Sequence, residues 1–147
     1  MRFICDVMLG KLAKYLRLLG FDTIYAASPS ALEAYRALPD DRVFLTRRKG
    51  ASGFPRTVLL ASERTRVQLT ELGPLIRAEK SRERALHRCI ECNVELVEAD
   101  KAEIESRVPE FVFHTYRAFK ICPSCARVYW EGSHVKGMES LIKEILS

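Results

Sequence analysis

Short apolar runs alternate with amphipathic segments along the first half of the chain. Four runs have the length and the β-branched or aromatic content of buried strands: Arg2–Cys5, Phe21–Ala26, Val43–Thr46 and Thr57–Ala61. Between the first two, apolar residues recur at the i, i+3, i+4, i+7 spacing of a helix: Leu9, Leu12, Ala13, Leu16 and Leu19. The pattern predicts strands that are joined by helices.

Capping residues mark the ends of the predicted helices. Gly20 is suited to end the first helix, because glycine readily adopts the left-handed conformation found there. Ser28 and Pro29 are suited to open a second helix, and Ser62 a third. Alternating strands and helices build a parallel sheet with helices on both faces. Residues 1–80 are therefore predicted to form an open α/β sandwich.

Composition and charge narrow the class of protein. The chain has 147 residues, of which 48% are hydrophobic, and this suits one ordinary core with a small appended module. No apolar run reaches the 18 residues of a membrane span, and Asp6 interrupts the N-terminal apolar stretch that a secretory signal needs. Residues 1–88 hold 17 basic and 9 acidic side chains, whereas residues 89–147 hold 7 and 10. We expect a cytoplasmic protein without membrane contact whose basic first part is compatible with a polyanionic partner.

Four of the five cysteines form two Cys-x-x-Cys pairs, Cys89 with Cys92 and Cys122 with Cys125. Each pair supplies two thiolates from one tight turn, and tetrahedral zinc takes four at about 2.3 Å. The spacing predicts a Zn²⁺ site that is structural, because four protein ligands leave no open position for catalysis. Iron is the chemical alternative for such a cage. Residues 81–147 are expected to form a zinc ribbon with a C-terminal helix.

Four segments carry a family resemblance: Asp6–Thr23, Leu45–Arg47, Arg88–Asn93 and Phe119–His134. Together they resemble the Mut-seven C-terminal RNase domain family, which consists of PIN-like ribonuclease domains with a C-terminal zinc ribbon. The resemblance covers essentially the whole chain. It implies a PIN-like α/β sandwich whose clustered carboxylates hold Mg²⁺ or Mn²⁺ and cleave RNA. Such cations take oxygen ligands, activate water and neutralise charge during phosphoryl transfer.

The acidic residues that the resemblance implies are only partly present. Asp6, at the end of the first strand, and Asp22, before the second, match acids of the family and are the candidate catalytic residues. A helix-capping role is the alternative for Asp6, and a turn role for Asp22. The family motif runs Leu-Thr-Arg-Asp, but Arg48 stands here in place of its aspartate. We expect Arg48 to occupy the space of a metal ion, where it pairs with Asp6 or meets a phosphate; a side chain that points into solvent is the alternative.

Basic side chains predict an RNA-binding surface at the carboxyl edge of the sheet, where α/β folds place their sites. Six cations are expected to follow a phosphate backbone: Lys11, Lys14, Arg17, Arg47, Arg48 and Lys49. A solvated helix face is the alternative for the first three, which recur every three residues. In the ribbon, Trp130 is a candidate for stacking on bases, or else for packing the ribbon. His134 is a candidate for contact with RNA, or else for a hydrogen bond in the cleft between the two domains.

Three functions fit these residues. The interpretation we favour is an RNA-binding protein of the ribonuclease family with a degenerate acidic site and weak or no cleavage. The alternatives are an active Mg²⁺- or Mn²⁺-dependent ribonuclease that hydrolyses RNA phosphodiester bonds, and an adaptor that uses the acidic surface of the ribbon. Acids that converge on Asp6 favour the enzyme, an Arg48–Asp6 contact favours the binding protein, and a large exposed apolar patch favours the adaptor.

Overall fold

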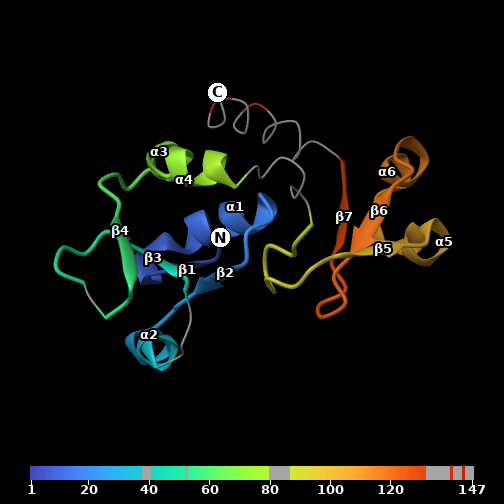
Figure 1. Ribbon diagram of the computed structural model, residues 1–147. Helices are drawn as coiled ribbons and strands as arrows, with labels where there is room; N and C mark the ends of the chain where they lie inside the picture. The colour runs from blue at the N-terminus through green and yellow to red at the C-terminus, as the bar shows by residue number, and fades with distance from the viewer. Residues whose placement is uncertain (38–40, 52, 80–86, 132–139, 141–143, 145–147) are drawn as a thin grey trace.

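The computed structural model describes residues 1–37, 41–51, 53–79, 87–131, 140 and 144. Two β-sheets organise these residues (Figure 1). The N-terminal sheet contains β1 (Phe3–Cys5), β2 (Thr23–Tyr25), β3 (Val43–Thr46) and β4 (Arg56–Leu59). The C-terminal sheet contains β5 (Val97–Ala99), β6 (Phe119–Ile121) and β7 (Val128–Trp130). The boundary expected near residue 80 falls between the described ranges.

The N-terminal sheet is parallel throughout, in the order β2-β1-β3-β4. In the middle of β1, Ile4 pairs with Ile24 of β2 on one side and with Phe44 of β3 on the other. β1 and β3 are buried along their whole length, which explains their unbroken apolar runs. The chain passes from β1 to β2 and then crosses to β3, so the strand order reverses between β1 and β3. The carboxyl ends of these two strands are where an open α/β sheet forms its crevice.

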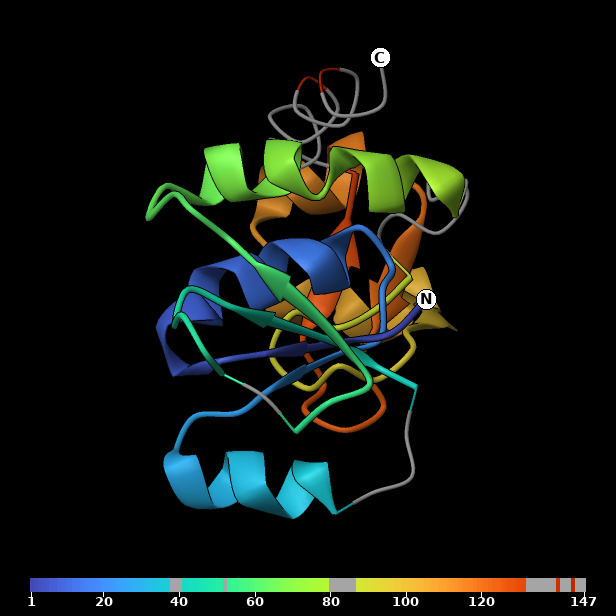
Figure 2. The same ribbon diagram turned by 60° about the vertical axis from the view of Figure 1, so that its left-hand side comes forward.

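Helices cover both faces of the parallel sheet (Figures 1 and 2). One face carries α1 (Gly10–Leu18), α3 (Thr65–Glu71) and α4 (Gly73–Ala78), and the other carries α2 (Pro29–Arg36). Leu12 and Leu69 belong to the larger core under the first face. Leu32 of α2 packs with Ile4 and Phe44 in a smaller core on the second. The predicted α/β sandwich is confirmed.

Two of the predicted helix caps are present and one is not. Ser28 Oγ accepts a hydrogen bond from the amide of Ala31 at 3.2 Å. Gly20 has φ of +92°, the left-handed conformation that follows the end of α1. The prediction that Ser62 caps the third helix is wrong: α3 begins at Thr65, and Ser62 Oγ accepts a hydrogen bond from the amide of Arg64 instead. The hydroxyl therefore closes the turn before the helix.

The C-terminal module (residues 87–131) has a small core of its own. Its antiparallel sheet, in the order β5-β6-β7, carries α5 (Lys101–Ile104) and α6 (Glu110–Thr115). Ile104, Val112 and Phe119 form the core, and Trp130 packs against them with its ring 6.5 Å from that of Phe119. The expected C-terminal helix falls outside the described residues, apart from residues 140 and 144. None of the described helices has the length and apolar composition of a membrane span.

Candidate functional site

Asp6 lies at the point where the strand order reverses, directly after β1, and its side chain is 2% exposed. Its Oδ1 accepts hydrogen bonds from the amide of Val7 at 2.9 Å and from Arg48 Nη2 at 3.0 Å. Its Oδ2 accepts from Thr46 Oγ1 and from Arg48 Nε, both at 2.7 Å. A carboxylate offers about four lone-pair positions, so these four donors satisfy it. The Arg48–Asp6 ion pair expected from the sequence is present, and Asp6 also caps the short helix at Val7–Leu9.

The sheet register brings these partners together. Cys5 pairs with Leu45, so Asp6, which follows β1, lies beside Thr46, the last residue of β3. Thr46 Oγ1 also accepts the amide hydrogen of Arg48 at 3.0 Å, which turns the chain so that the guanidinium reaches back to Asp6. Burial raises the pKa of Asp6, but the hydrogen bonds from Thr46 and Arg48 and the charge of Arg48 outweigh it and hold the pKa below its ordinary value. Asp6 is thus an ionised carboxylate covered by a half-exposed guanidinium.

Asp22, the second candidate acid, lies at the other end of the sheet. Phe3 pairs with Thr23, so Asp22 precedes β2 at the amino edge, whereas Asp6 follows β1 at the carboxyl edge. Within the described part of the chain, the one group of three or more acidic, histidine or cysteine side chains with metal-binding geometry is the cysteine cluster. The structure therefore places Asp22 and Asp6 at opposite edges of the sheet, and the turn role that was the alternative for Asp22 agrees with this position.

The carboxylate of Asp22 is instead part of a structural link. Arg42 donates two hydrogen bonds to it, at 2.7 Å to Oδ1 and 3.1 Å to Oδ2. The side-chain amide of Asn93, from the C-terminal module, donates a third at 2.7 Å. Burial raises the pKa of Asp22, but the bonds from Arg42 and Asn93 outweigh it and lower the pKa. Asp22 thus joins the parallel sheet to the C-terminal module.

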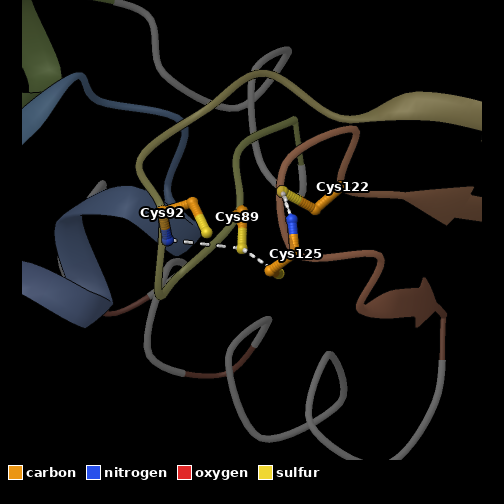
Figure 3. Close-up of side chains that lie close together, drawn as sticks. All are labelled: Cys89, Cys92, Cys122 and Cys125. Carbon is orange, nitrogen blue, oxygen red and sulfur yellow. Dashed lines mark hydrogen bonds between the residues drawn. The ribbon is translucent and has the colours of Figure 1, made fainter.

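The four paired cysteines converge at one point, with their sulfur atoms within 4.8 Å of one another (Figure 3). Cys89 Sγ and Cys125 Sγ are 3.7 Å apart. A tetrahedron with metal–sulfur bonds of about 2.3 Å has edges of about 3.8 Å, so this spacing fits zinc. Backbone amides also point at the sulfurs: that of Cys92 donates to Cys89 Sγ at 3.4 Å, and that of Cys125 to Cys122 Sγ at 3.5 Å. The donor set therefore fits a closed four-thiolate metal site.

The two cysteine turns have the same backbone geometry. In the first cysteine turn (Cys89–Asn93), the amide of Asn93 donates to the carbonyl of Cys89 at 2.9 Å, and in the second (Cys122–Ala126) the amide of Ala126 donates to the carbonyl of Cys122 at 2.9 Å. Asn93 has φ of +62° and Ala126 φ of +63°. Asparagine tolerates this left-handed conformation, whereas alanine adopts it at a cost.

Tyr129 is a contact of the metal site that the sequence analysis did not assign. Its hydroxyl donates to Cys89 Sγ at 3.1 Å and accepts from the amide of Ile90 at 3.1 Å. Burial raises the pKa of the Cys89 thiol, but the hydrogen bonds from Tyr129 and from backbone amides outweigh it and lower the pKa to about 7. The thiolate is the form that binds a metal. The signal in the sequence was the position of Tyr129 on the strand that follows the second cysteine pair.

A family model described as the Mut7-C RNAse domain matches residues 1–142. The chain belongs to this family. In the two other comparisons, no curated protein and no solved structure matched. The Mut7-C match covers both the parallel sheet and the four-cysteine site, as the resemblance of the sequence motifs implied.

Two of the cations predicted for the RNA surface of this Mut7-C protein lie against the first cysteine turn. Lys14 Nζ is 3.0 Å from a carboxylate oxygen of Glu91. Arg17 donates from Nε to the carbonyl of Thr23 at 2.9 Å, and from Nη1 to the carbonyls of Ile90 at 2.9 Å and Glu91 at 3.2 Å. Both side chains therefore connect α1 to the C-terminal module, and their contact with RNA stays a prediction.

The other predicted cations remain near the carboxyl edge of the Mut7-C sheet. Lys11 lies in the first turn of α1, and Lys49 follows Arg48; both are exposed, and Arg47 is half-buried. Arg64, which the sequence analysis did not single out, is exposed in the loop after β4 at the same edge. Because Arg64 follows the fourth predicted strand, its place in the sequence could have indicated that it lies at this edge. Trp130 serves the core of the C-terminal module, and His134 lies outside the described residues.

Proposed function

We propose that this Mut7-C family protein binds RNA at the carboxyl edge of its parallel sheet and does not cleave it by a metal-dependent reaction. The observation that carries the proposal is the pair of hydrogen bonds from Arg48 to Asp6. The family resemblance implies carboxylates that share a divalent cation. Here a fixed cation of the chain neutralises the carboxylate at that position.

The energetics favour Arg48 over a metal ion at Asp6. A hydrogen bond between charged partners contributes about 1.5–3 kcal/mol, and a metal ion must displace two of them. Mg²⁺ prefers octahedral oxygen coordination through one or two carboxylates and the substrate phosphate. Among the described residues, Asp6 belongs to no acidic group of metal-binding geometry. A metal ion that displaced Arg48 would therefore gain few oxygen ligands in exchange for the two hydrogen bonds that are lost.

The same edge supports contact with phosphates. The side chain of Arg48 is half exposed, and exposed cations lie on the neighbouring loops and helix: Lys11, Lys49 and Arg64. Arginine binds phosphate through its planar fork, and lysine through a mobile point charge. Contacts of this kind position a backbone without reading its sequence, and they weaken as salt rises.

The zinc that we assign to the four cysteines has a structural role in this proposal. Four thiolates complete a tetrahedral coordination sphere and leave no open position for a substrate or an activated water.

Binding and cleavage of a labelled single-stranded RNA and of an RNA hairpin test the proposal. The protein is kept saturated with zinc, and Mg²⁺ or Mn²⁺ is added or left out, because chelators that remove these ions also remove zinc. We expect equal affinity with and without the added ions, and intact RNA after prolonged incubation. Cleavage that needs Mn²⁺ or Mg²⁺ and disappears in Asp6→Asn would establish the ribonuclease alternative. Absence of RNA binding at low salt would overturn the proposal altogether.

A further inference from the structure

The first cysteine turn is bonded to the amino edge of the parallel sheet through Arg17. The guanidinium of this residue contacts the carbonyls of Ile90 and Glu91, the two residues that separate the ligand cysteines of the turn. Its Nε holds the carbonyl of Thr23 at the start of β2. One half-buried side chain of α1 therefore joins the interior of the metal-binding turn to the edge of the sheet.

Asn93 makes the second connection. Its Oδ1 accepts the amide hydrogen of Thr23 at 2.9 Å, and its Nδ2 donates to Asp22 at 2.7 Å. Asn93 directly follows Cys92, and its left-handed backbone belongs to the geometry of the turn. The amide and the carbonyl of Thr23 are thus both bonded to groups that depend on the docked turn: Asn93 for the amide, and Arg17 for the carbonyl.

Charge complements this geometry. Four thiolates around a Zn²⁺ ion carry a net charge of about −2, which favours a nearby cation in a partly buried setting. Arg17 supplies a positive charge from α1, directly against the backbone of the turn. Lys14, one helical turn earlier, adds an ion pair with Glu91.

We propose that zinc binding and the docking of the first cysteine turn on the parallel sheet are thermodynamically linked, with Arg17 as a positioning residue of the metal site. The carbonyls of Ile90 and Glu91 and the side chain of Asn93 face the sheet because the cysteine turn is closed. Closure of such a turn is part of metal binding, since metal sites of this kind seldom persist without the ion. By linkage, docking strengthens zinc binding as much as zinc binding strengthens docking. The inference is independent of the proposed RNA binding.

Hydrogen exchange of the wild-type protein tests the link in one direction. The amide of Thr23 reports docking directly, because its acceptor is Asn93 Oδ1. The amide of Asp6, bonded to Leu45 at the opposite edge, and the amide of Leu60, bonded to Thr46, serve as internal references. After zinc is removed with a chelator, we expect the exchange of Thr23 to accelerate more than that of either reference, and to return to its original rate when zinc is restored.

Zinc affinity of variants tests the link in the other direction. In competition with a chromophoric chelator, Arg17→Ala is expected to bind zinc about tenfold more weakly, the usual loss when a group that orients metal ligands is removed. Lys11→Ala is the matched control, because it removes one positive charge from the same helix at an exposed position. Asn93→Ala, which lacks the side-chain bonds to Thr23 and Asp22, is expected to weaken zinc binding as well.

Two results would show that zinc binding and docking are not linked. If Thr23 stays protected without zinc, or if Arg17→Ala and Asn93→Ala bind zinc as tightly as Lys11→Ala, metal binding and docking are independent and the proposal fails. If Arg17→Ala does not fold, the exchange experiment on the wild-type protein and the affinity of Asn93→Ala still decide it. Since neither measurement involves RNA, failure of the proposed RNA binding leaves this test unaffected.

Discussion

Asp6 and Asp22 lie at opposite ends of the paired strands β1 and β2, and each carboxylate receives two hydrogen bonds from an arginine. Arg48 holds Asp6 at the carboxyl edge, and Arg42 holds Asp22 at the amino edge. The first pair covers the position where the family resemblance places a metal. The second supports the contact with the C-terminal module. Asp6 and Asp22, which both match acids of the family motif, thus lie at opposite edges of the sheet with different arginine partners.

Replacing Arg48 with aspartate is expected to create a divalent metal site. Arg48→Asp removes the guanidinium from Asp6 and places a second carboxylate close to it, as in the Leu-Thr-Arg-Asp motif of the family. We expect Mn²⁺ affinity to rise by about tenfold or more, because carboxylate oxygens are the preferred ligands of hard cations. Titration of zinc-saturated protein with Mn²⁺, followed by electron paramagnetic resonance, measures the change. Arg48→Ala, which adds no carboxylate, should gain less, and equal affinity in all three proteins would argue against this assignment of the site.

The ion pair between Arg48 and Asp6 predicts a pH-dependent loss of stability. Because the folded-state pKa of Asp6 is lowered, its pairing favours the folded state above the unfolded pKa of about 3.9 and is lost as the pH falls through the folded value. Arg48→Ala should therefore lower the free energy of unfolding at pH 7 by about 1 kcal/mol, a modest value because Arg48 is half exposed. Urea unfolding between pH 7 and pH 3 should show this difference from wild type shrinking in acid.

Acid also protonates the thiolates, but that effect is common to both proteins and cancels in the difference. Lys49→Ala, which removes an exposed cation one residue away, is the control and should show no such pH dependence. A difference between wild type and Arg48→Ala that stays constant down to pH 3 would show that the pairing of Asp6 does not stabilise the fold.

The salt dependence of RNA binding distinguishes the cations that contact RNA from those that join α1 to the first cysteine turn. Lys49→Ala should weaken RNA binding and lower the slope of log K against log salt by about 0.7, the share of one contact with single-stranded phosphate. Lys14→Ala should leave the slope unchanged, because Lys14 already pairs with Glu91. Fluorescence anisotropy between about 50 and 200 mM salt gives both slopes. If Lys14→Ala lowers the RNA affinity and the salt slope as much as Lys49→Ala does, the exposed face of α1 also contacts RNA.

The matched backbone of the two cysteine turns predicts opposite effects of glycine. Ala126→Gly should stabilise the zinc-bound protein by about 1 kcal/mol, because glycine adopts φ of +63° without the clash that an alanine Cβ makes. Asn93→Gly has the same backbone preference but loses the side-chain bonds to Thr23 and Asp22, so it should destabilise the protein. Thermal unfolding in excess zinc measures both variants. Stabilisation by Asn93→Gly would mean that its side-chain contacts contribute little.

The parallel sheet and the metal-binding cysteines follow from local patterns in the sequence. The buried strand β1 and the first three residues of β3 are apolar runs, and the cysteine spacing predicts two tight turns. The placement of Arg48 beside Asp6 follows from two further facts. Asp6 directly follows β1 and Arg48 lies two residues after the end of β3, and the carboxyl ends of parallel strands lie at one edge. The same rule places Asp22, which precedes its strand, at the opposite edge, so the sequence did contain the signal that separates the two acids.

The contacts between α1 and the first cysteine turn could not be predicted from sequence patterns. Helical periodicity shows that Lys14 and Arg17 share the polar face of α1, but it does not show which surface covers that face. The carbonyls of Ile90 and Glu91 that Arg17 contacts are backbone groups, which every residue possesses and no motif marks. Such partners depend on the three-dimensional placement of the C-terminal module.

The bonds that Thr23 forms with Asn93 and Arg17 also bear on self-association. They occupy backbone groups of β2, which is one outer strand of the parallel sheet, while β4 is the other. A sheet with two open borders can add copies of itself without limit, whereas one with a single open border can at most pair with a second molecule. With its amide bonded to Asn93 and its carbonyl to Arg17, Thr23 offers no free backbone group to an added strand, so the start of β2 is protected from edge-to-edge pairing.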